Sequence, residues 1–359
     1  MNQPKPSIVG RASAENPPNR YERIHLETEL VADRVEGTQE DPHRKVPTEF
    51  FDDAARSIIR ENDSPDIPFR YSINPYRGCE HGCAYCYART GHETLGWGAG
   101  LDFETKILVK RNAADLLRHE LGRPKWRGEV IAISGYTDCY QPAERELRVT
   151  RSCLEVLHEA NQAIGIVTKN GLVTRDIELL ASMAEKQLVH VNITVTSLDQ
   201  ELTRTMEPRT ASPQARLRAM RTLVDAGVPV RVMVAPVIPG LTDHEMPNIL
   251  RESRDAGATG ASYQMLRLPL SVEPVFLEWV RQNYPQYYDR IENRIRQLHG
   301  GQIYRGQFGQ RMRGSGALAE SIHATFHAFA KKFGLDNQLT LDTSRFRPPV
   351  DVTGQQYLF

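Results

Sequence analysis

The chain lacks an excess of charge of either sign, because 45 Lys and Arg residues balance 45 Asp and Glu residues. That balance excludes a strongly basic protein that coats nucleic acid. No apolar run approaches the roughly 18 residues that a membrane-spanning helix needs. The first residues show neither an apolar segment nor the cleavage pattern of a secretory signal. We therefore expect a cytoplasmic protein that does not bind membranes.

Cysteine is also scarce, with five residues in a chain of 359. An odd set is a poor pattern for the disulfide framework of a secreted protein. Cys79, Cys83 and Cys86 lie within eight positions, whereas Cys139 and Cys153 stand apart. This crowding favours metal or redox chemistry in a reducing compartment. The remaining composition, 40% hydrophobic and 25% charged, is that of a globular protein and excludes collagen and general disorder.

The pattern along the chain divides it into three regions. Residues 1–48 are rich in Pro, Asn, Glu and Arg without a sustained period, which predicts a flexible, disordered N-terminal arm. In residues 49–269, β-branched runs alternate with helical stretches, as expected for βα units around a parallel sheet. After residue 269 this alternation stops, and residues 270–359 are expected to form an α-rich C-terminal extension.

The repeated βα units predict an α/β fold, a partial (β/α)6 barrel of the TIM-like kind. The expected strands are short apolar runs, at 69–74, 129–134, 163–168, 188–195, 228–237 and 259–266. Ser212 as N-cap and Pro213 at the first helical position predict one helix start. Thr242 and Glu245 predict a capping box at another. A Rossmann-type sheet is the alternative, but no GxGxxG motif follows the first strand.

The segment GCEHGCAYCYAR brings three thiols close together in sequence. They can converge only if the backbone turns sharply, which Gly78 and Gly82 permit because glycine accepts a positive φ. A structural zinc site would need a fourth ligand, such as His81 or His92. A four-iron cluster would instead leave one iron open to a small molecule. Three buried, inert cysteines are the remaining alternative.

The motif CxxxCxxC after the first expected strand, with Tyr85 before its third cysteine, resembles the radical S-adenosylmethionine (SAM) superfamily. Within it, SINPYRGCEHGCAYCYAR, TDCYQPAERE, TKNGLVTRD, MEPR and VAPVIPGLTD resemble the bacterial spore-photoproduct-lyase-like proteins, also described as DNA repair photolyase-like. The likeness spans residues 50–335.

This resemblance implies a barrel of the radical SAM type and a 4Fe-4S cluster held by Cys79, Cys83 and Cys86. The open iron would bind SAM, whose reductive cleavage releases a 5′-deoxyadenosyl radical that abstracts hydrogen from a substrate. A reductant such as flavodoxin or ferredoxin is implied as a partner.

Polar residues follow the expected strands at their carboxyl ends, where the functional groups of such barrels gather. Thr137 and Asp138 are expected to bind the methionine ammonium of SAM, and Lys169 its carboxylate. Thr194 and Thr196 would offer hydroxyls to the carboxylate or the ribose. The resemblance supports Thr137, Lys169 and Thr194. Turn, cap and solvated-surface roles are the plainer interpretations of the same residues.

The resemblance nominates further site residues. Tyr85 is expected to border the cofactor, and Val237 to line the adenine, with core packing as its alternative. In the lyases, the tyrosine after the third cysteine relays the radical together with a cysteine donor after the second strand. Tyr87 matches that tyrosine, but Gly135 stands at the donor position, and the nearest thiol is Cys139. Tyr87 and Cys139 are therefore the expected catalytic residues, and reversal of thymine dimers is disfavoured.

The sequence leaves three substrate classes open, namely a nucleic-acid lesion or base, a protein side chain and a small metabolite. The first is favoured by analogy alone. A non-catalytic zinc or iron–sulfur binding module, including one that binds nucleic acid, is the rival function.

Glu207 and Arg209, in MEPR, are expected to form an ion pair bordering the pocket.

Overall fold

The computed structural model describes residues 8–21 and 45–350, and its main sheet has seven strands in the order β10-β9-β8-β7-β6-β3-β2. The neighbours from β3 to β10 are parallel, and β2 is antiparallel to β3 at the edge. The strands are β2 (Ile59–Glu61), β3 (Tyr71–Ile73), β6 (Ile131–Ile133), β7 (Ile164–Thr168), β8 (Val189–Thr194), β9 (Val230–Val237) and β10 (Gly260–Met265). All six expected parallel strands are present, and the partial barrel is confirmed.

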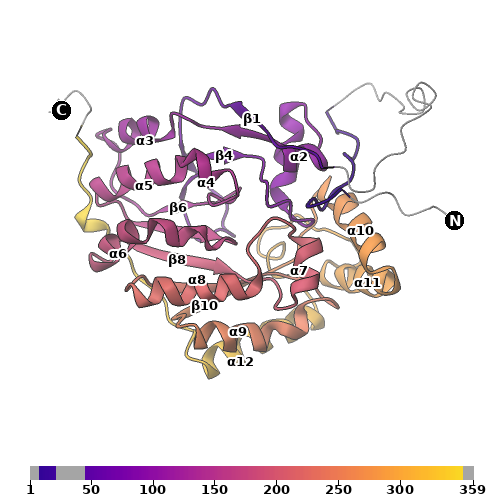
Figure 1. The fold of residues 1–359 in the computed structure, drawn as a ribbon. Helices are drawn as coiled ribbons and strands as arrows, with labels where there is room; N and C mark the ends of the chain where they lie inside the picture. The colour runs from indigo at the N-terminus through magenta and orange to yellow at the C-terminus, as the bar shows by residue number, and fades with distance from the viewer. Residues whose placement is uncertain (1–7, 22–44, 351–359) are drawn as a thin grey trace, which may run out of the picture.

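Helices cover the outer face of this sheet. In Figure 1, α5, α6, α8 and α9 follow one another down one side of the molecule in chain order. The helices of this region are α3 (Ala113–Leu121), α4 (Glu144–Leu147), α5 (Val149–Glu159), α6 (Ile177–Glu185), α7 (Gln200–Met206), α8 (Pro213–Asp225) and α9 (Met246–Asp255). Strands such as β7 and β8 are buried along nearly their whole length, which explains their continuous apolar sequences.

Both predicted helix starts are present, but the hydrogen bonds of the predicted capping box are not formed. The Ser212 side chain accepts a hydrogen bond from the backbone N–H of Ala215, and Pro213 opens α8. Thr242 instead accepts from the backbone N–H of Ile238 at 2.9 Å. Glu245 accepts from the Ser197 hydroxyl at 2.6 Å. A donor four residues before Thr242 and a donor from the loop after β8 thus replace the reciprocal capping box.

A second, three-stranded sheet lies beside the barrel. It consists of β1 (Glu49–Asp52), β5 (Lys106–Val109) and β4 (Tyr76–Arg77), with β5 in the centre. The short helix α2 (Leu101–Thr105) leads into β5. The sequence reasoning predicted none of these elements, since each is too short to show a period.

Residues 8–21 are bound to this region, so the predicted disordered arm is wrong for the part that the structure describes. The backbone N–H of Leu101 donates to the Glu15 carbonyl at 3.3 Å. The backbone N–H of Asp102 donates to Asn16 Oδ1 at 3.0 Å. A Cβ at Gly100 would clash with the Glu15 carbonyl, so the backbones of the two segments are in direct contact. Residues 1–7 and 22–44 of the predicted arm lie outside the described residues.

The C-terminal extension contains α10 (Val272–Asn283), α11 (Tyr288–Leu298) and α12 (Ala317–Lys332). Helix α12 joins the main core through Ile322 and Phe326. Helices α10 and α11 form a second core that also contains Cys83 and Tyr85. The extension therefore packs against both the barrel and the cysteine segment. Among the described residues, every helix is too short or too polar to cross a membrane.

Candidate active site

The cysteine loop turns at its two glycines, as predicted. Gly78 has a φ of +78° and Gly82 a φ of +63°, both in the left-handed region. A Cβ at Gly78 would lie 2.8 Å from the Lys106 carbonyl oxygen, and one at Gly82 would lie 2.7 Å from Glu104 Oε2. Neither position has room for a side chain, so both the φ values and the close packing require glycine.

The thiols of Cys79, Cys83 and Cys86 line one cavity of about 160 Å3. All three are free cysteines, and Cys79 and Cys83 are only 5% and 6% exposed. Burial raises the pKa of each thiol above its usual value. A polynuclear cluster divides such thiols among several iron atoms, so they need not converge on one point.

The described part of the chain offers no set of ligands for a structural zinc ion. There, no three His, Cys, Asp or Glu side chains converge closely enough to hold a single metal ion. The two histidines suggested as fourth ligands are engaged elsewhere. His81 Nδ1 lies 3.4 Å from Asp138 Oδ2, and His92 Nε2 lies 3.0 Å from the Lys106 carbonyl oxygen. The thiols are thus left without a fourth protein ligand among these residues.

Arg89 holds the cysteine loop in place, and the sequence reasoning missed it. Its side chain is fully buried and donates to the carbonyl oxygens of Gly82 and Cys83, at 3.1 Å and 2.9 Å. It also forms an ion pair of 2.6 Å with the buried carboxylate of Glu104. Its place three residues after Cys86 was the available signal, but a lone arginine near a motif does not reveal that it is buried.

Most of the predicted site residues line the same cavity. These are Tyr85, Tyr87, Thr137, Asp138, Lys169 and Thr194, together with the three cysteines. They come from the cysteine loop and the carboxyl ends of β6, β7 and β8, as expected for a barrel of parallel strands.

Three predicted residues lie elsewhere. Cys139 is fully buried in the main core and does not line the cavity, which contradicts its expected position as a donor there. Val237 also belongs to the core, while Ala235 and Pro236 take its expected place on the cavity wall. Thr196 lies behind the wall, where its hydroxyl donates to the Ala235 carbonyl at 2.8 Å. Core packing, the plainer interpretation, applies to Cys139 and Val237.

Lys169 is a buried cation of the cavity wall rather than a solvated turn residue. Its Nζ donates to the Ala235 carbonyl at 3.0 Å and to Thr196 Oγ1 at 3.3 Å. Glu207 Oε1 lies 3.4 Å away. Burial lowers the pKa of Lys169 to about 7, although a negative Cys83 would oppose this shift. An anionic ligand would favour its charged form.

Glu207 is a buried carboxylate that bonds several side chains next to the cavity. It accepts hydrogen bonds from the phenol of Tyr85, from Thr196 Oγ1 and from the guanidinium of Arg216. The predicted pair with Arg209 is wrong, because Arg209 lies 2.9 Å from Glu80 instead. Glu207 faces inward because Arg216, wholly buried on α8, supplies its counter-charge. The MEPR motif drew attention to Glu207 but not to this partner.

Asp138 joins the ends of two neighbouring strands. Its carboxylate accepts hydrogen bonds from Thr168 Oγ1 and from the backbone N–H of Lys169, both at 2.8 Å. Burial would raise the pKa of Asp138, but His81 and the backbone N–H groups of Lys169 and Tyr140 outweigh it and lower the pKa below its usual value. Thr137 donates its hydroxyl to the Tyr76 carbonyl at 2.7 Å. Both residues therefore fix the cavity wall as well as face the cavity.

Tyr87 lies against Gly135 and Arg267. Its hydroxyl donates to the Gly135 carbonyl at 2.9 Å, and Arg267 Cζ stands 3.9 Å from the centre of its ring. Burial raises the pKa of Tyr87 to about 12, with the Arg267 charge opposing the rise. A Cβ at Gly135 would lie 3.0 Å from Ser72 Cβ, so the position is tight for any side chain.

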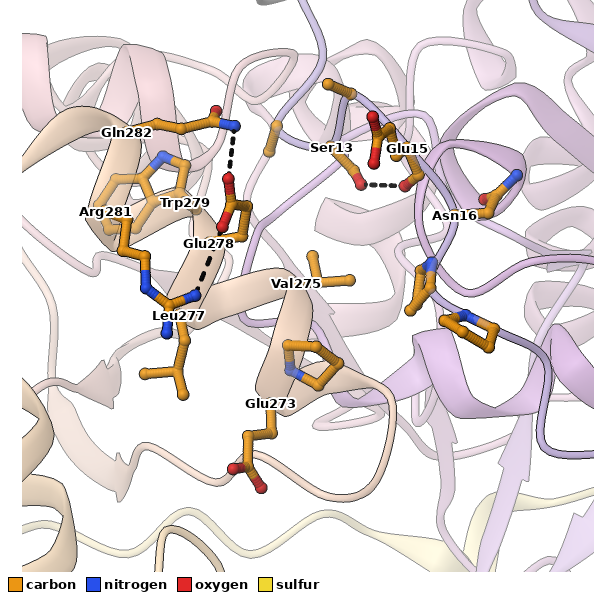
Figure 2. Close-up of a pocket in the computed structure, with 15 residues that line it drawn as sticks. Ser13, Glu15, Asn16, Glu273, Val275, Leu277, Glu278, Trp279, Arg281 and Gln282 are labelled. Atoms are coloured by element: carbon orange, nitrogen blue, oxygen red, sulfur yellow. Dashed lines mark hydrogen bonds and ion pairs between the residues drawn. The ribbon is translucent and has the colours of Figure 1, made fainter. Parts of the chain in front are cut away.

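A larger cavity of about 470 Å3 lies between residues 12–18 and α10 (Figure 2). Within it, Arg281 and Gln282 both contact the carboxylate of Glu278, at 3.4 Å and 3.1 Å. It shares no lining residue with the cysteine cavity, and none of the predicted site residues lines it. The convergence of thiols, a buried cation and hydroxyls makes the smaller cavity the candidate active site.

Comparison with known proteins points to the same region. The family described as the Radical SAM superfamily matches residues 73–252, which contain the cysteine loop, Lys169 and Glu207. An uncharacterized protein of Mycobacterium tuberculosis H37Rv is 40% identical over 235 residues, covering 65% of this chain and 68% of that protein. An uncharacterized protein of Methanocaldococcus jannaschii is 30% identical over 225 residues, covering 63% of this chain and 80% of its own.

Two solved structures of spore photoproduct lyase are similar in fold. A mutant of that enzyme gives a TM-score of 0.58 at 18% identity, covering 79% of each chain. The enzyme complexed with dinucleoside spore photoproduct gives a TM-score of 0.58 at 17% identity, again covering 79% of each chain. At such identities the likeness concerns the arrangement of the elements.

Proposed function

This chain belongs to the radical SAM superfamily, and from that membership we propose that it is an enzyme that cleaves SAM reductively. Cys79, Cys83 and Cys86 would hold a 4Fe-4S cluster in the cavity that they line. The observation that carries the proposal is that these three thiols, two of them buried, line one cavity with the largely buried amine of Lys169.

The donor set fits such a cluster. Thiolates are the usual ligands of iron–sulfur clusters, and three of them leave one iron of four open to a small molecule. His81 and His92, the nearby imidazoles, are held by Asp138 and by the Lys106 carbonyl. When bound, a reduced cluster of this kind supplies the electron that splits SAM into methionine and a 5′-deoxyadenosyl radical, which abstracts hydrogen from the substrate.

The chain's own residues would bind and orient SAM. Lys169 would hold the methionine carboxylate, kept in position by Thr196 and Glu207. The Thr194 hydroxyl would assist it, and Thr137 and Asp138 would receive the ammonium. Tyr85 lines the cavity with its phenol fixed by Glu207. Tyr87 would move a hydrogen at its hydroxyl oxygen, which the Gly135 carbonyl orients.

For the substrate we propose a nucleic-acid base or lesion, supported by analogy with a protein solved with dinucleoside spore photoproduct. Thymine-dimer reversal that uses a cysteine donor is disfavoured here. Gly135 occupies the expected donor position, and Cys139 lies in the core rather than on the cavity. A reductant such as flavodoxin or ferredoxin would supply the electron.

The test is anaerobic reconstitution with iron and sulfide, followed by dithionite and SAM. We expect an iron- and sulfide-bearing protein that forms methionine and 5′-deoxyadenosine, detected by mass spectrometry. Cys83→Ala should abolish this activity, whereas Cys153→Ala, a change in the core, should retain it. An iron-loaded protein without turnover would support the binding module instead. Incubation with deuterium-labelled oligonucleotides, followed by a search for label in 5′-deoxyadenosine, tests the substrate class.

A further inference from the structure

Arg267 lies just beyond the end of β10, on the wall of the cysteine cavity. The backbone before it is fixed on two sides. The N–H of Met265 donates to the Met312 carbonyl, and the N–H of Leu266 donates to the Val237 carbonyl, both at 3.0 Å. The position of Arg267 is therefore set by the sheet and by the C-terminal extension together.

The guanidinium of Arg267 packs over Tyr87, with 3.9 Å between Cζ and the ring centre. The ring covers one face of the guanidinium, and the Tyr87 hydroxyl also has a hydrogen bond with the Arg267 side chain. The Arg267 Nε is buried, and it has no hydrogen-bond partner among the described residues. An unpaired buried donor destabilises a fold, and more so when it belongs to a charged group. A ligand that brings an oxygen acceptor would supply the hydrogen bond that this Nε lacks.

Other buried arginines of this chain are supplied with acceptors. Arg89 has the Glu104 carboxylate at 2.6 Å and several backbone carbonyls. Arg216 has the Glu207 carboxylate and the Thr194 carbonyl. Both of these fully buried arginines thus have a built-in carboxylate, whereas the partly buried Arg267 keeps an unpaired, buried Nε.

The acidic groups around Arg267 are already engaged. Asp66, whose carboxylate feels the Arg267 charge, accepts from Arg311 Nε and from the backbone N–H of Gly309, both at 2.6 Å. Asp138, across the cavity lining, is bonded to Thr168 and to the Lys169 N–H. Lys169, the other cation of the cavity wall, has Glu207 at 3.4 Å.

We propose that Arg267 binds an anionic group of the substrate, a phosphate or a carboxylate, and so places the adjoining part of the substrate beside Tyr87. The guanidinium can donate in its plane to two oxygens of such a group while its face stays on the ring. The inference rests on the proposed function, in which Tyr87 moves a hydrogen to or from the substrate. It assigns the carboxylate of SAM to Lys169 and the anion of the substrate to Arg267.

The experiment measures binding of phenyl phosphate, benzoate and the neutral benzamide to the full chain by saturation-transfer NMR. The variants are Arg267→Gln, Arg267→Lys and the exposed control Arg305→Gln. We expect at least one anion to bind, with benzamide failing to compete. Affinity should fall about tenfold in Arg267→Gln, remain intermediate in Arg267→Lys and stay unchanged in Arg305→Gln. Preference for phenyl phosphate would identify a phosphate, and preference for benzoate a carboxylate.

Equal binding of the anions to Arg267→Gln and the parent chain would overturn the proposal, as would equal binding of benzamide. A SAM affinity weakened tenfold by Arg267→Gln would also overturn it, because the guanidinium would then serve the SAM carboxylate. The proposed function fails separately. If the reconstituted parent chain forms no 5′-deoxyadenosine without substrate, SAM cleavage is refuted whatever the probes show.

Discussion

Arg89 and Glu104 form an ion pair of 2.6 Å in which neither side chain is exposed to solvent. The pair joins the cysteine loop to the N-terminal segment. On one side, Arg89 donates to the Cys83 carbonyl. On the other, Glu104 accepts from the backbone N–H groups of Ala12 and Ser13, at 3.2 Å and 3.1 Å. The geometry of the predicted cluster ligands therefore depends on residues about seventy positions earlier in the chain.

Replacement of Glu104 should destabilise both the fold and the cysteine loop. Glu104→Gln leaves the buried charge of Arg89 without its counter-charge, which typically costs about 3–5 kcal/mol. The variant should also retain less iron after reconstitution. Urea unfolding of the cluster-free chain and iron analysis measure the two effects. The control is Asp52→Asn, which breaks the exposed pair with Arg111 and should cost under about 1 kcal/mol. Equal effects of the two changes would contradict this account of the loop.

The close approach of residues 13–16 to Gly100 can be tested with a single methyl group. Gly100→Ala adds a Cβ that would clash with the Glu15 carbonyl. We expect a loss of about 1–3 kcal/mol in unfolding free energy. Proteolysis should also become faster within residues 8–21. Gly171→Ala, whose Cβ would meet its nearest atoms at 3.7 Å, is the matched control and should be neutral. An unchanged cleavage rate in Gly100→Ala would show that the segment is not held there.

Lys169→Gln should weaken SAM binding by about tenfold or more, because a charge-assisted hydrogen bond to the carboxylate is lost. Iron content should stay unchanged, since Lys169 is not a predicted ligand. Equilibrium dialysis of labelled SAM against the reconstituted protein measures the affinity. Lys186→Gln is the control, because its Nζ donates to Asn161 Oδ1 and it does not line the cavity. Unaltered SAM affinity in Lys169→Gln would remove Lys169 from the proposed site.

One buried and one partly buried histidine should make the fold sensitive to mild acid. Burial lowers the pKa of both His92 and His190 to about 4, with Arg231 adding to the effect at His190. Because the unfolded chain binds protons at these side chains near pH 6.5, stability should be lost as the pH falls from about 6.5 towards 4.

The contribution of His190 can be separated with one variant. His190→Gln should remove about 2 kcal/mol of the loss between pH 7 and pH 5, measured by urea unfolding of the cluster-free chain. The exposed His244→Gln should leave the pH dependence unaltered. Parallel curves for His190→Gln and the parent chain would show that His190 does not titrate as described.

The sequence was informative where a local rule decides the structure. The apolar runs of β7 and β8 identify buried parallel strands. Ser212 and Pro213 define a helix start whose donors lie within four residues. The spacing of Cys79, Cys83 and Cys86, with glycine before the first two, predicted one converging loop.

The sequence was silent where a partner far along the chain decides. Glu245 has the pattern of a capping-box residue, but the Ser197 hydroxyl, 48 residues earlier, binds it instead. Glu207 was paired with its neighbour Arg209, whereas its counter-charge is Arg216, which the first turn of α8 brings back to it. Residues 8–21 carry no periodic signal, because backbone hydrogen bonds and glycine contacts hold them rather than an apolar face.

The central claim is that the three thiols hold an iron–sulfur cluster with one iron left for SAM. Its most direct test is electron paramagnetic resonance of the anaerobically reconstituted, dithionite-reduced chain, recorded with and without SAM and paired with iron and sulfide analysis. We predict close to four iron and four sulfide per chain and a spectrum that SAM shifts. One zinc per chain without sulfide, or a cluster spectrum that SAM leaves unchanged, would contradict the account.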